Sequence, residues 1–329
     1  MTINKNHIIF IILLSLLITS QIIVILDNQD NYIHKYDYKS YKKVAKTFIG
    51  QNTTIRNRDW QYPPLYSILI IPTLFIDENN YLMFFQLICS VIAFYFLFLF
   101  CDMFVSKQKA MLISFFVIYF SPAFIVTRIG MPIGLSSMLF IIFCYYLYKY
   151  SFYSYINSSI TFLLLILTKY LFIALVPFII YWLYINYKST IKFFIPPLVL
   201  LCIWFVRNAF LYGFSVKGII GGYYHIDLNL SLVPQKIAFL FTDNSAIFII
   251  LIYITFLVSY LFLFKFTEQK HNKYFIFNSL LLLYLITTFF MFGFLYDVDG
   301  FRIRYFIYQT PVIFSLAFIN IIYIDKLKG

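Results

Sequence analysis

Long apolar runs alternate with short polar connections along almost all of the 329-residue chain. A transmembrane helix needs about 20 predominantly apolar residues, and somewhat fewer where helices are tilted or packed together. The pattern therefore predicts about ten spans, at 8–26, 81–104, 110–126, 132–148, 156–167, 170–185, 191–211, 245–266, 274–295 and 305–324. We predict an all-α, polytopic transmembrane helical bundle, with residues 1–329 in a single integral-membrane domain.

The runs 156–167 and 170–185 are short, and only Thr168-Lys169 separates them. They could form a hairpin of two short helices or one long kinked span. The pattern leaves both alternatives open.

The longest polar segment near the N-terminus covers residues 27–64. Its last residues belong to the motif Tyr62-Pro63-Pro64-Leu65-Tyr66. The following residues, 64–75, are apolar but too short to span, and they contain Pro72. An amphipathic helix lying at the interface fits such a segment better than a crossing does. We therefore predict a long first loop, residues 27–80, between the first two spans.

Composition supports a membrane environment, because 62% of the residues are hydrophobic and only 12% are charged. The four cysteines all lie in apolar runs and have no metal-ligand spacing. The net charge of +12 suits an anionic membrane surface or an anionic substrate better than nucleic acid. No phosphate-binding or dinucleotide-binding glycine motif occurs.

Charge also predicts the orientation. With both termini in the cytoplasm, every short cytoplasmic connection is basic, as the positive-inside rule requires. The basic residues of the first loop oppose this arrangement, but long loops translocate largely regardless of charge. We expect a multi-pass protein of the cell membrane whose first loop is extracytoplasmic.

Two acids of this loop could carry chemistry. Asp37 stands between Tyr36 and Tyr38, and a carboxylate that aromatic rings partly desolvate is more basic, which suits a general base. A solvated loop acid beside lysines is the alternative. Asp27 lies at the exit of the first span and could instead orient a substrate.

Arginines at the predicted outer side could bind an anion. Arg207 lies in an apolar span, where a guanidinium marks a functional site unless it extends to the headgroups. Arg302 and Arg304 precede the last span and could clamp a phosphate, or could pair with Asp297 and Asp299.

Weaker candidates complete the predicted site. Arg128 and Lys169 are cations at the outer ends of short spans and could help to hold a phosphate. His225 follows a glycine pair in the loop 213–244, where an ordinary turn is the alternative. Tyr38, Tyr41 and Tyr62 could contact an acceptor. We predict no metal site, although paired carboxylates could bind a divalent cation.

Four segments, in this order, resemble motifs of the GT-C superfamily of polytopic glycosyltransferases. They are Asp37-Tyr38 with Tyr41 and Ala45, Tyr62-Pro63-Pro64-Leu65-Tyr66, Trp204 with Arg207-Asn208 and Gly213, and Arg304-Tyr305 with Pro311. Protein O-mannosyltransferases, lipid A aminoarabinose transferases and bacterial mannosyltransferases are relatives in that superfamily.

The resemblance implies a hexosyl or pentosyl transferase that uses a polyprenyl-phosphate sugar at the outer face of the cell membrane. It implies that Asp37, or else Asp27, is the base of an inverting transfer and that Arg207, Arg302 and Arg304 hold the phosphate. The acceptor would be a glycan, lipid or protein of the cell envelope. The alternatives are a flippase or transporter of lipid-linked sugars, and a polysaccharide polymerase or ligase.

Overall fold

The structure is a computed structural model. It describes residues 5–27, 35–51, 63–124, 132–149, 151–187, 191–212, 244–266, 273–288 and 307–328. Throughout these ranges the regular elements are helices and no strand occurs, which confirms the predicted all-α class for them. The elements are α1 (Lys5–Asp27), α2 (Lys35–Phe48), α3 (Pro64–Leu69), η2 (Ile71–Leu74), α4 (Glu78–Asp102), α5 (Lys107–Phe120), α6 (Ile133–Tyr148), α7 (Phe152–Thr168), η3 (Tyr170–Leu175), α8 (Val176–Tyr187), α9 (Ile191–Tyr212), α12 (Asn244–Phe266), α13 (Lys273–Thr288), η7 (Ile307–Gln309) and α14 (Thr310–Lys328).

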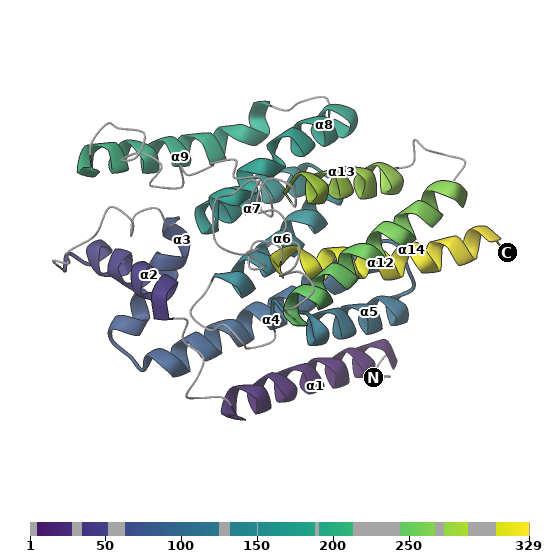
Figure 1. Ribbon diagram of the computed structural model, residues 1–329, viewed down its shortest axis with the longest axis horizontal. Coiled ribbons are helices and arrows are strands. Elements are labelled where there is room, and N and C mark those ends of the chain that lie inside the picture. Colours follow the sequence, from purple (N-terminus) through teal and green to yellow (C-terminus); the bar gives the residue numbers. More distant parts are fainter. Residues whose placement is uncertain are drawn as a thin grey trace.

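Most of the long helices run broadly side by side, and α2 and α3 lie together at one end of the bundle (Figure 1). A helix occupies each apolar run that the sequence predicts to span, wholly or in part. Four described segments are both long and apolar enough to cross a membrane: Asn6–Ile23, Glu78–Asp102, Ile247–Lys265 and Ile307–Ile324. The chain therefore has the helices of a membrane protein.

The residues 156–185 form two helices that reverse direction. Lys169 ends α7, and its ammonium lies over the ring of Tyr308, at the start of the last helix. Trp182 of α8 donates its indole N–H to the carbonyl of Leu147, at 2.9 Å, beside the residues where α7 begins. The chain has thus run back to the end of the bundle at which α7 begins. Of the two alternatives, the structure therefore has the hairpin and not one long kinked helix.

Aromatic side chains fill the interior of the bundle. The ring of Phe140 on α6 packs against Phe172, Tyr284 and Tyr308, with centroids 6.0–6.4 Å apart. Helices α4 and α6 approach closely where Gly134 faces Gln86. A Cβ atom at Gly134 would collide with the side-chain amide of Gln86, so glycine leaves the space that this amide occupies.

Buried amides link three helices inside the bundle. The Asn320 Nδ2 of α14 lies 3.2 Å from the Ser259 Oγ of α12 and 3.4 Å from the Asn278 Oδ1 of α13. The Tyr274 hydroxyl donates to the Asn320 side chain. Each of these buried polar groups thereby has a partner, as an apolar surrounding requires. The last predicted span is also the most enclosed of the four long ones, with 72% of its residues buried.

The polar sequence of the first loop predicted a loop, and the structure shows that this loop contains the helix α2. Tyr38, Tyr41, Val44 and Ala45 are buried and recur at helical spacing on one face. The helix ends at Phe48, and Gly50 shortly after it has a φ of +75°, the left-handed conformation typical of a residue just past a helix. The Gln51 amide donates to the Lys46 carbonyl and the Gly50 amide to the Thr47 carbonyl, which completes a Schellman motif.

The predicted interfacial helix after the proline pair takes the form of two short pieces, α3 and η2. Pro64 occupies the first turn of α3, where its missing N–H is no loss. Tyr66, Ser67 and Thr73 are buried, whereas Phe75 is 71% exposed. The segment therefore has one face buried against the bundle and another that points away from it.

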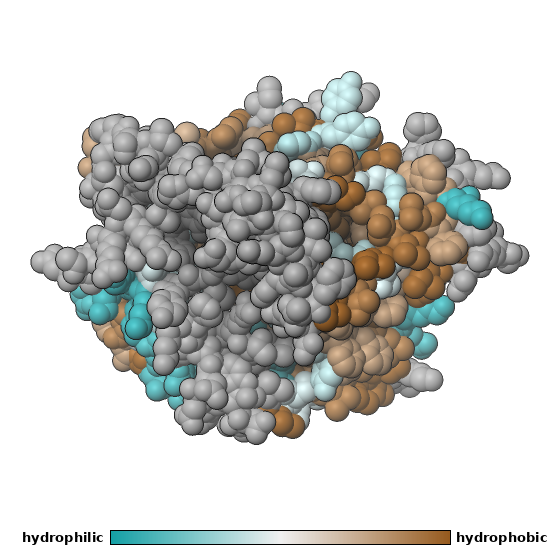
Figure 2. All heavy atoms as spheres, in the orientation of Figure 1, coloured by the Kyte–Doolittle hydropathy of each residue, from teal (hydrophilic) through white to brown (hydrophobic). Residues whose placement is uncertain are grey.

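The two ends of the bundle differ. At one, which we call the lysine end, α1 and α5 begin and α6 ends, near Lys107, Lys109, Lys149 and Lys273. The Gln108 Nε2 lies 3.5 Å from the Asn6 Oδ1, and Lys273 donates to the Tyr148 carbonyl at 2.6 Å. We call the other end, which carries α2 and α3, the α2 end. On the face drawn in Figure 2, a hydrophobic area covers much of the described surface, and hydrophilic residues lie toward the edges.

Candidate functional site

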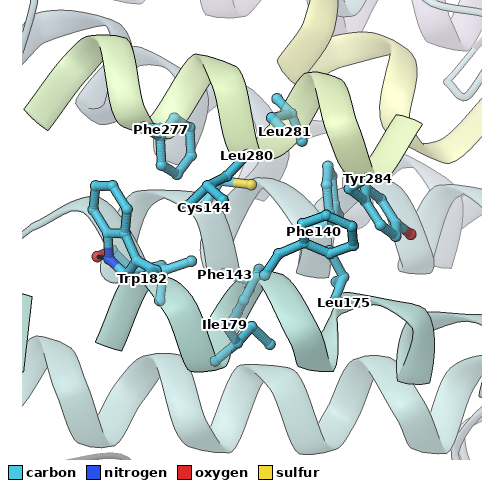
Figure 3. A pocket seen from close by; sticks show the side chains of 12 residues that line it. Phe140, Phe143, Cys144, Leu175, Ile179, Trp182, Phe277, Leu280, Leu281 and Tyr284 are labelled. Carbon is cyan, nitrogen blue, oxygen red and sulfur yellow. Dashed lines mark hydrogen bonds between the residues drawn. The ribbon is translucent and has the colours of Figure 1, made fainter. Parts of the chain in front are cut away.

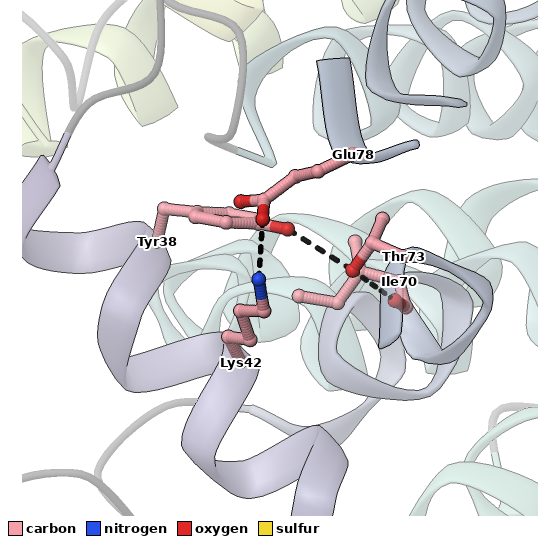
Figure 4. Close-up of polar contacts among 5 residues, drawn as sticks. All are labelled: Tyr38, Lys42, Ile70, Thr73 and Glu78. Carbon is pink, nitrogen blue, oxygen red and sulfur yellow. Dashed lines mark hydrogen bonds and ion pairs between the residues drawn. The ribbon is translucent and has the colours of Figure 1, made fainter. Parts of the chain in front are cut away.

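Helix α2 is held against α3 and η2 by two buried tyrosines. The Tyr41 ring meets the Tyr66 ring edge to face, with centroids 4.9 Å apart. The Tyr38 hydroxyl donates to the Thr73 Oγ1 at 3.1 Å, and Thr73 in turn donates to the Ile70 carbonyl at 2.7 Å (Figure 4). Tyr38 and Tyr41 were both predicted to contact an acceptor, and in the structure both are buried and pack α2 on α3 and η2.

Tyr38 and Tyr66 are phenols held in their neutral form. Burial raises the pKa of Tyr38 well above its usual range, the bond to Thr73 opposes this, and the charge of Glu78 adds to it. Burial also raises the pKa of Tyr66. The neutral Tyr38 hydroxyl therefore remains a hydrogen-bond donor at physiological pH and is no candidate for a base.

An ion pair that the sequence pattern did not predict joins α2 to α4. Lys42 contacts the Glu78 carboxylate, close to the Tyr38 ring (Figure 4). Glu78 opens α4 directly after Asp77, whose side chain accepts from the Asn80 amide at 2.7 Å as a helix N-cap. The adjacent Asp77-Glu78 pair was a sequence signal for this helix start. Both acids belong to the segment between the first two predicted spans.

The two predicted base candidates occupy helix positions. Asp27 is the last residue of α1, and Asp37 is the third residue of α2. Their side chains lie outside the described part of the structure. Helix geometry places Asp37 about 16 Å along the axis from Phe48, at about 1.5 Å per residue.

Arg207 of α9 meets the far end of α2. Its guanidinium lies over the Trp204 ring, 4.6 Å from the centroid, and 5.7 Å from the centroid of Phe48. The Phe48 and Trp204 rings are themselves 6.2 Å apart. Such cation–π contacts contribute about 0.5–2 kcal/mol, depending on solvation. Residues far apart in the chain thus come together at the α2 end.

Lys169 lies over a second aromatic cluster at the same end. Its ammonium is 5.2 Å from the centroid of the Tyr308 ring. Gln309 donates to the Tyr308 hydroxyl at 2.8 Å and accepts from the Tyr253 hydroxyl at 3.1 Å. The Tyr284 hydroxyl lies 3.4 Å from that of Tyr308. Tyr284, Tyr308 and Gln309 are buried and Tyr253 is partly buried, so this polar group lies among helices α12, α13 and η7.

Helix α7 connects these features, because it contacts both α3 and α9 and leads directly to Lys169. The described α2 end therefore collects α2, α3, the end of α9 and the end of α7. Among the predicted phosphate ligands, the structure describes Arg207 and Lys169 there.

The remaining predicted site residues lie outside the described residues. They are Arg128, Arg302, Arg304, Tyr62 and His225. Tyr308 follows Arg304 by only four positions in the sequence, so the described chain resumes at the aromatic cluster beneath Lys169.

The described residues include no group of three or more His, Cys, Asp or Glu side chains that could hold a metal ion. A narrow pocket between α6, α8 and α13 is lined by apolar and aromatic groups such as Phe143, Cys144, Trp182 and Phe277 (Figure 3). It offers hydrocarbon contacts and no catalytic acid or base. No family model matches the chain, and no curated protein matches it in sequence.

Proposed function

We propose that the protein is a membrane glycosyltransferase, with ten spans and both termini in the cytoplasm. It would move a sugar from a polyprenyl-phosphate donor to a glycan, lipid or protein acceptor at the outer face of the cell membrane. The observation that carries this proposal is the contact of Arg207 with Phe48, because it joins a cation of a later helix to the first-loop helix that contains Asp37.

The environment of Arg207 suits the recognition of a lipid-linked phosphate. The Arg207 guanidinium carbon lies 4.6 Å from the centroid of the Trp204 ring and 5.7 Å from that of Phe48, and a guanidinium held by aromatic rings can still bind phosphate through its N–H groups. The two interactions are compatible, and the rings orient the group before substrate arrives. A guanidinium also stays protonated, so it can stabilise the negative charge that grows on a departing phosphate.

In this proposal Asp37 is the general base, and Asp27 is the alternative. The acceptor hydroxyl gives its proton to the carboxylate while its oxygen attacks the anomeric carbon. The bond from that carbon to the phosphate oxygen breaks, and the lipid phosphate leaves with the electron pair. The configuration at the anomeric carbon is inverted. Because the anomeric carbon is bonded to the phosphate oxygen, the sugar and the phosphate of the donor would bind between Asp37 and Arg207, and the two side chains must approach each other when the donor binds.

The proposal is tested with purified protein in proteoliposomes, a panel of labelled polyprenyl-phosphate sugars and envelope acceptors. We expect sugar transfer with release of the lipid phosphate. Asp37→Asn should lower the turnover by about 10²–10⁴-fold, the usual contribution of a general base. Asp27→Asn and Glu78→Gln, tested in parallel, separate the contributions of Asp37, Asp27 and Glu78.

Asp102→Asn is the matched control, since Asp102 ends α4 at the lysine end, and it should leave turnover unchanged. Near-wild-type turnover of Asp37→Asn would remove that residue from the role. If no donor supports transfer by the wild-type protein, the proposal fails. Movement of labelled lipid across the bilayer without loss of the sugar would instead identify a flippase.

A further inference from the structure

A cavity of about 270 Å³ lies between α1, α4 and α5 at the lysine end. It is far from the α2 end, where the proposed transfer takes place. Asn6, His7 and Lys107 provide its polar lining, and His7 and Lys107 are exposed. The cavity is several times larger than the ~30 Å³ that one water molecule occupies. It can therefore accept a group of the size of a phosphate ester.

The deeper lining is apolar. Phe10 and Phe98 are half-buried, and Met111 is buried, whereas the Tyr95 ring is exposed at the edge. The Phe10 ring stacks on Phe94 with centroids 5.2 Å apart, which fixes α1 against α4. The cavity is therefore amphipathic, with donors at its rim and hydrocarbon below them.

Charge around the cavity favours an anion. Lys107 opens α5, and neither α1 nor α5 has an acid in its first turn. Both helices begin at this end, so the positive ends of two helix dipoles lie near the polar lining. Asp102, at the end of α4, is the acid that the chain places closest to α5, and it is not part of the cavity lining.

The surfaces beside the cavity identify the source of the anion. Ile11 on α1 is 59% exposed and Leu112 on α5 is 46% exposed, as expected of helices that face lipid. A free phosphate ion would gain nothing from Phe10, Phe98 and Met111. A membrane lipid satisfies both parts of the lining, since its phosphate and its acyl chains are joined in one molecule.

We propose that this cavity binds an anionic glycerophospholipid, with the phosphate at Lys107 and His7 and the first acyl carbons against Phe10 and Phe98. Lys107 supplies the charge, and the His7 imidazole can donate a hydrogen bond whether it is protonated or neutral. The bound lipid would join α1 to α4 and α5. This site does not depend on the glycosyltransferase function.

The test is native mass spectrometry of the full-length protein released from nanodiscs of phosphatidylglycerol, phosphatidylcholine or an equal mixture. We expect the wild-type protein to retain phosphatidylglycerol in preference to phosphatidylcholine. The double variant H7L/K107Q should retain about tenfold less phosphatidylglycerol, because it loses the charge of Lys107 and the hydrogen-bond donor of His7. Lys109→Gln is the matched control, since it removes the same charge from the same helical turn without touching the cavity.

Three results from these measurements would overturn the proposal. They are equal retention of both lipids by the wild-type protein, unchanged retention by the double variant, and an equal loss in Lys109→Gln. The wild-type comparison stands even if the double variant does not fold. A fourth arm adds a polyprenyl phosphate, and its displacement of phosphatidylglycerol at equal concentration would assign the cavity to the carrier lipid and overturn the phospholipid assignment.

Discussion

The α2 end and the lysine end both carry cations, but only the α2 end is covered by a separate helical unit in the part of the chain that the structure describes. There α2 packs on α3 and η2 through Tyr38 and Tyr41, and Lys42 pairs with Glu78. At the lysine end the described helices simply begin and end, and Lys107 is exposed. Cations on aromatic rings occur at both ends, as the contacts of α9 and α13 show.

The difference between the two ends indicates that they have different roles. Short connections and basic residues suffice to anchor helices at a membrane surface. An additional amphipathic helix, held by buried tyrosines and ending beside an arginine from another helix, is more than such anchoring requires. Substitutions at the two ends should therefore differ in their effects, and the largest effect is expected at Arg207.

Helix α9 carries a cation near each of its ends, so it offers an internal comparison. Arg207→Ala should lower kcat/KM for sugar transfer by about 10²–10³-fold, the usual effect of removing one donor to a charged transition state. Lys192→Ala, near the other end of the same helix, should change it less than about twofold, because it lies far from the transferred group. Steady-state kinetics in proteoliposomes gives both values. Equal losses of kcat/KM in the two variants would contradict the proposed role of Arg207 in binding the phosphate.

The docking of α2 can be weakened through its buried ring. Tyr41→Ala removes an aromatic side chain that is only 4% exposed, which should cost about 3 kcal/mol of local stability. We expect amide hydrogen exchange in α2 to become on the order of 100-fold faster. Tyr95→Ala at the lysine end removes a 47% exposed ring and should leave exchange in α4 nearly unchanged. Protection of α2 that survives Tyr41→Ala would contradict the packing described for it.

Alkaline pH should loosen the α2 end through Tyr38. The raised pKa keeps this phenol protonated in the folded state, while an unfolded tyrosine ionises at about pH 10. The resulting stability is complete below about pH 10 and is lost as the pH rises further, up to the folded pKa. The protection factors of the α2 amides, which are corrected for the intrinsic exchange rate at each pH, should therefore fall above about pH 10 in the wild-type protein and less so in Tyr38→Phe. At neutral pH, Tyr38→Phe should cost only about 1 kcal/mol, for one hydrogen bond.

The ion pair of Lys42 with Glu78 should have the smallest effect. Both side chains are more than a quarter exposed, at 29% and 27%, so the pair should contribute less than about 1 kcal/mol. A double-mutant cycle with Lys42→Gln and Glu78→Gln, followed by thermal unfolding in detergent, measures it. A coupling well above that value would show that the α2 end excludes water more completely than its surface exposure indicates.

Hydrophobic runs predicted the helices of the bundle well, because spans in lipid must be apolar along their whole length. The same criterion missed α2, which is rich in lysine and tyrosine. The repeat of Tyr38, Tyr41, Val44 and Ala45, followed by Gly50, was the signal that could have revealed it. The spacing of the apolar residues in this segment, rather than their number, indicates the helix.

The contacts of the candidate site were less predictable than its residues. Arg207 was singled out as a cation in an apolar run, but nothing in the chain indicated that its neighbour is Phe48. Lys42 and Glu78 are 36 positions apart, and their pairing depends on how η2 returns the chain to α4. Local patterns predict elements, whereas such partners depend on how the elements pack together.

The enclosure of α14 has a consequence for biosynthesis. Among the described helices it leaves the ribosome after all the others, and yet it supplies Asn320, the amide that Tyr274, Asn278 and Ser259 share. Until it inserts, those polar groups have no access to that partner within the hydrocarbon. The nascent bundle must therefore stay open on that side, or be shielded by the insertion machinery, and its assembly finishes only after translation has passed this helix.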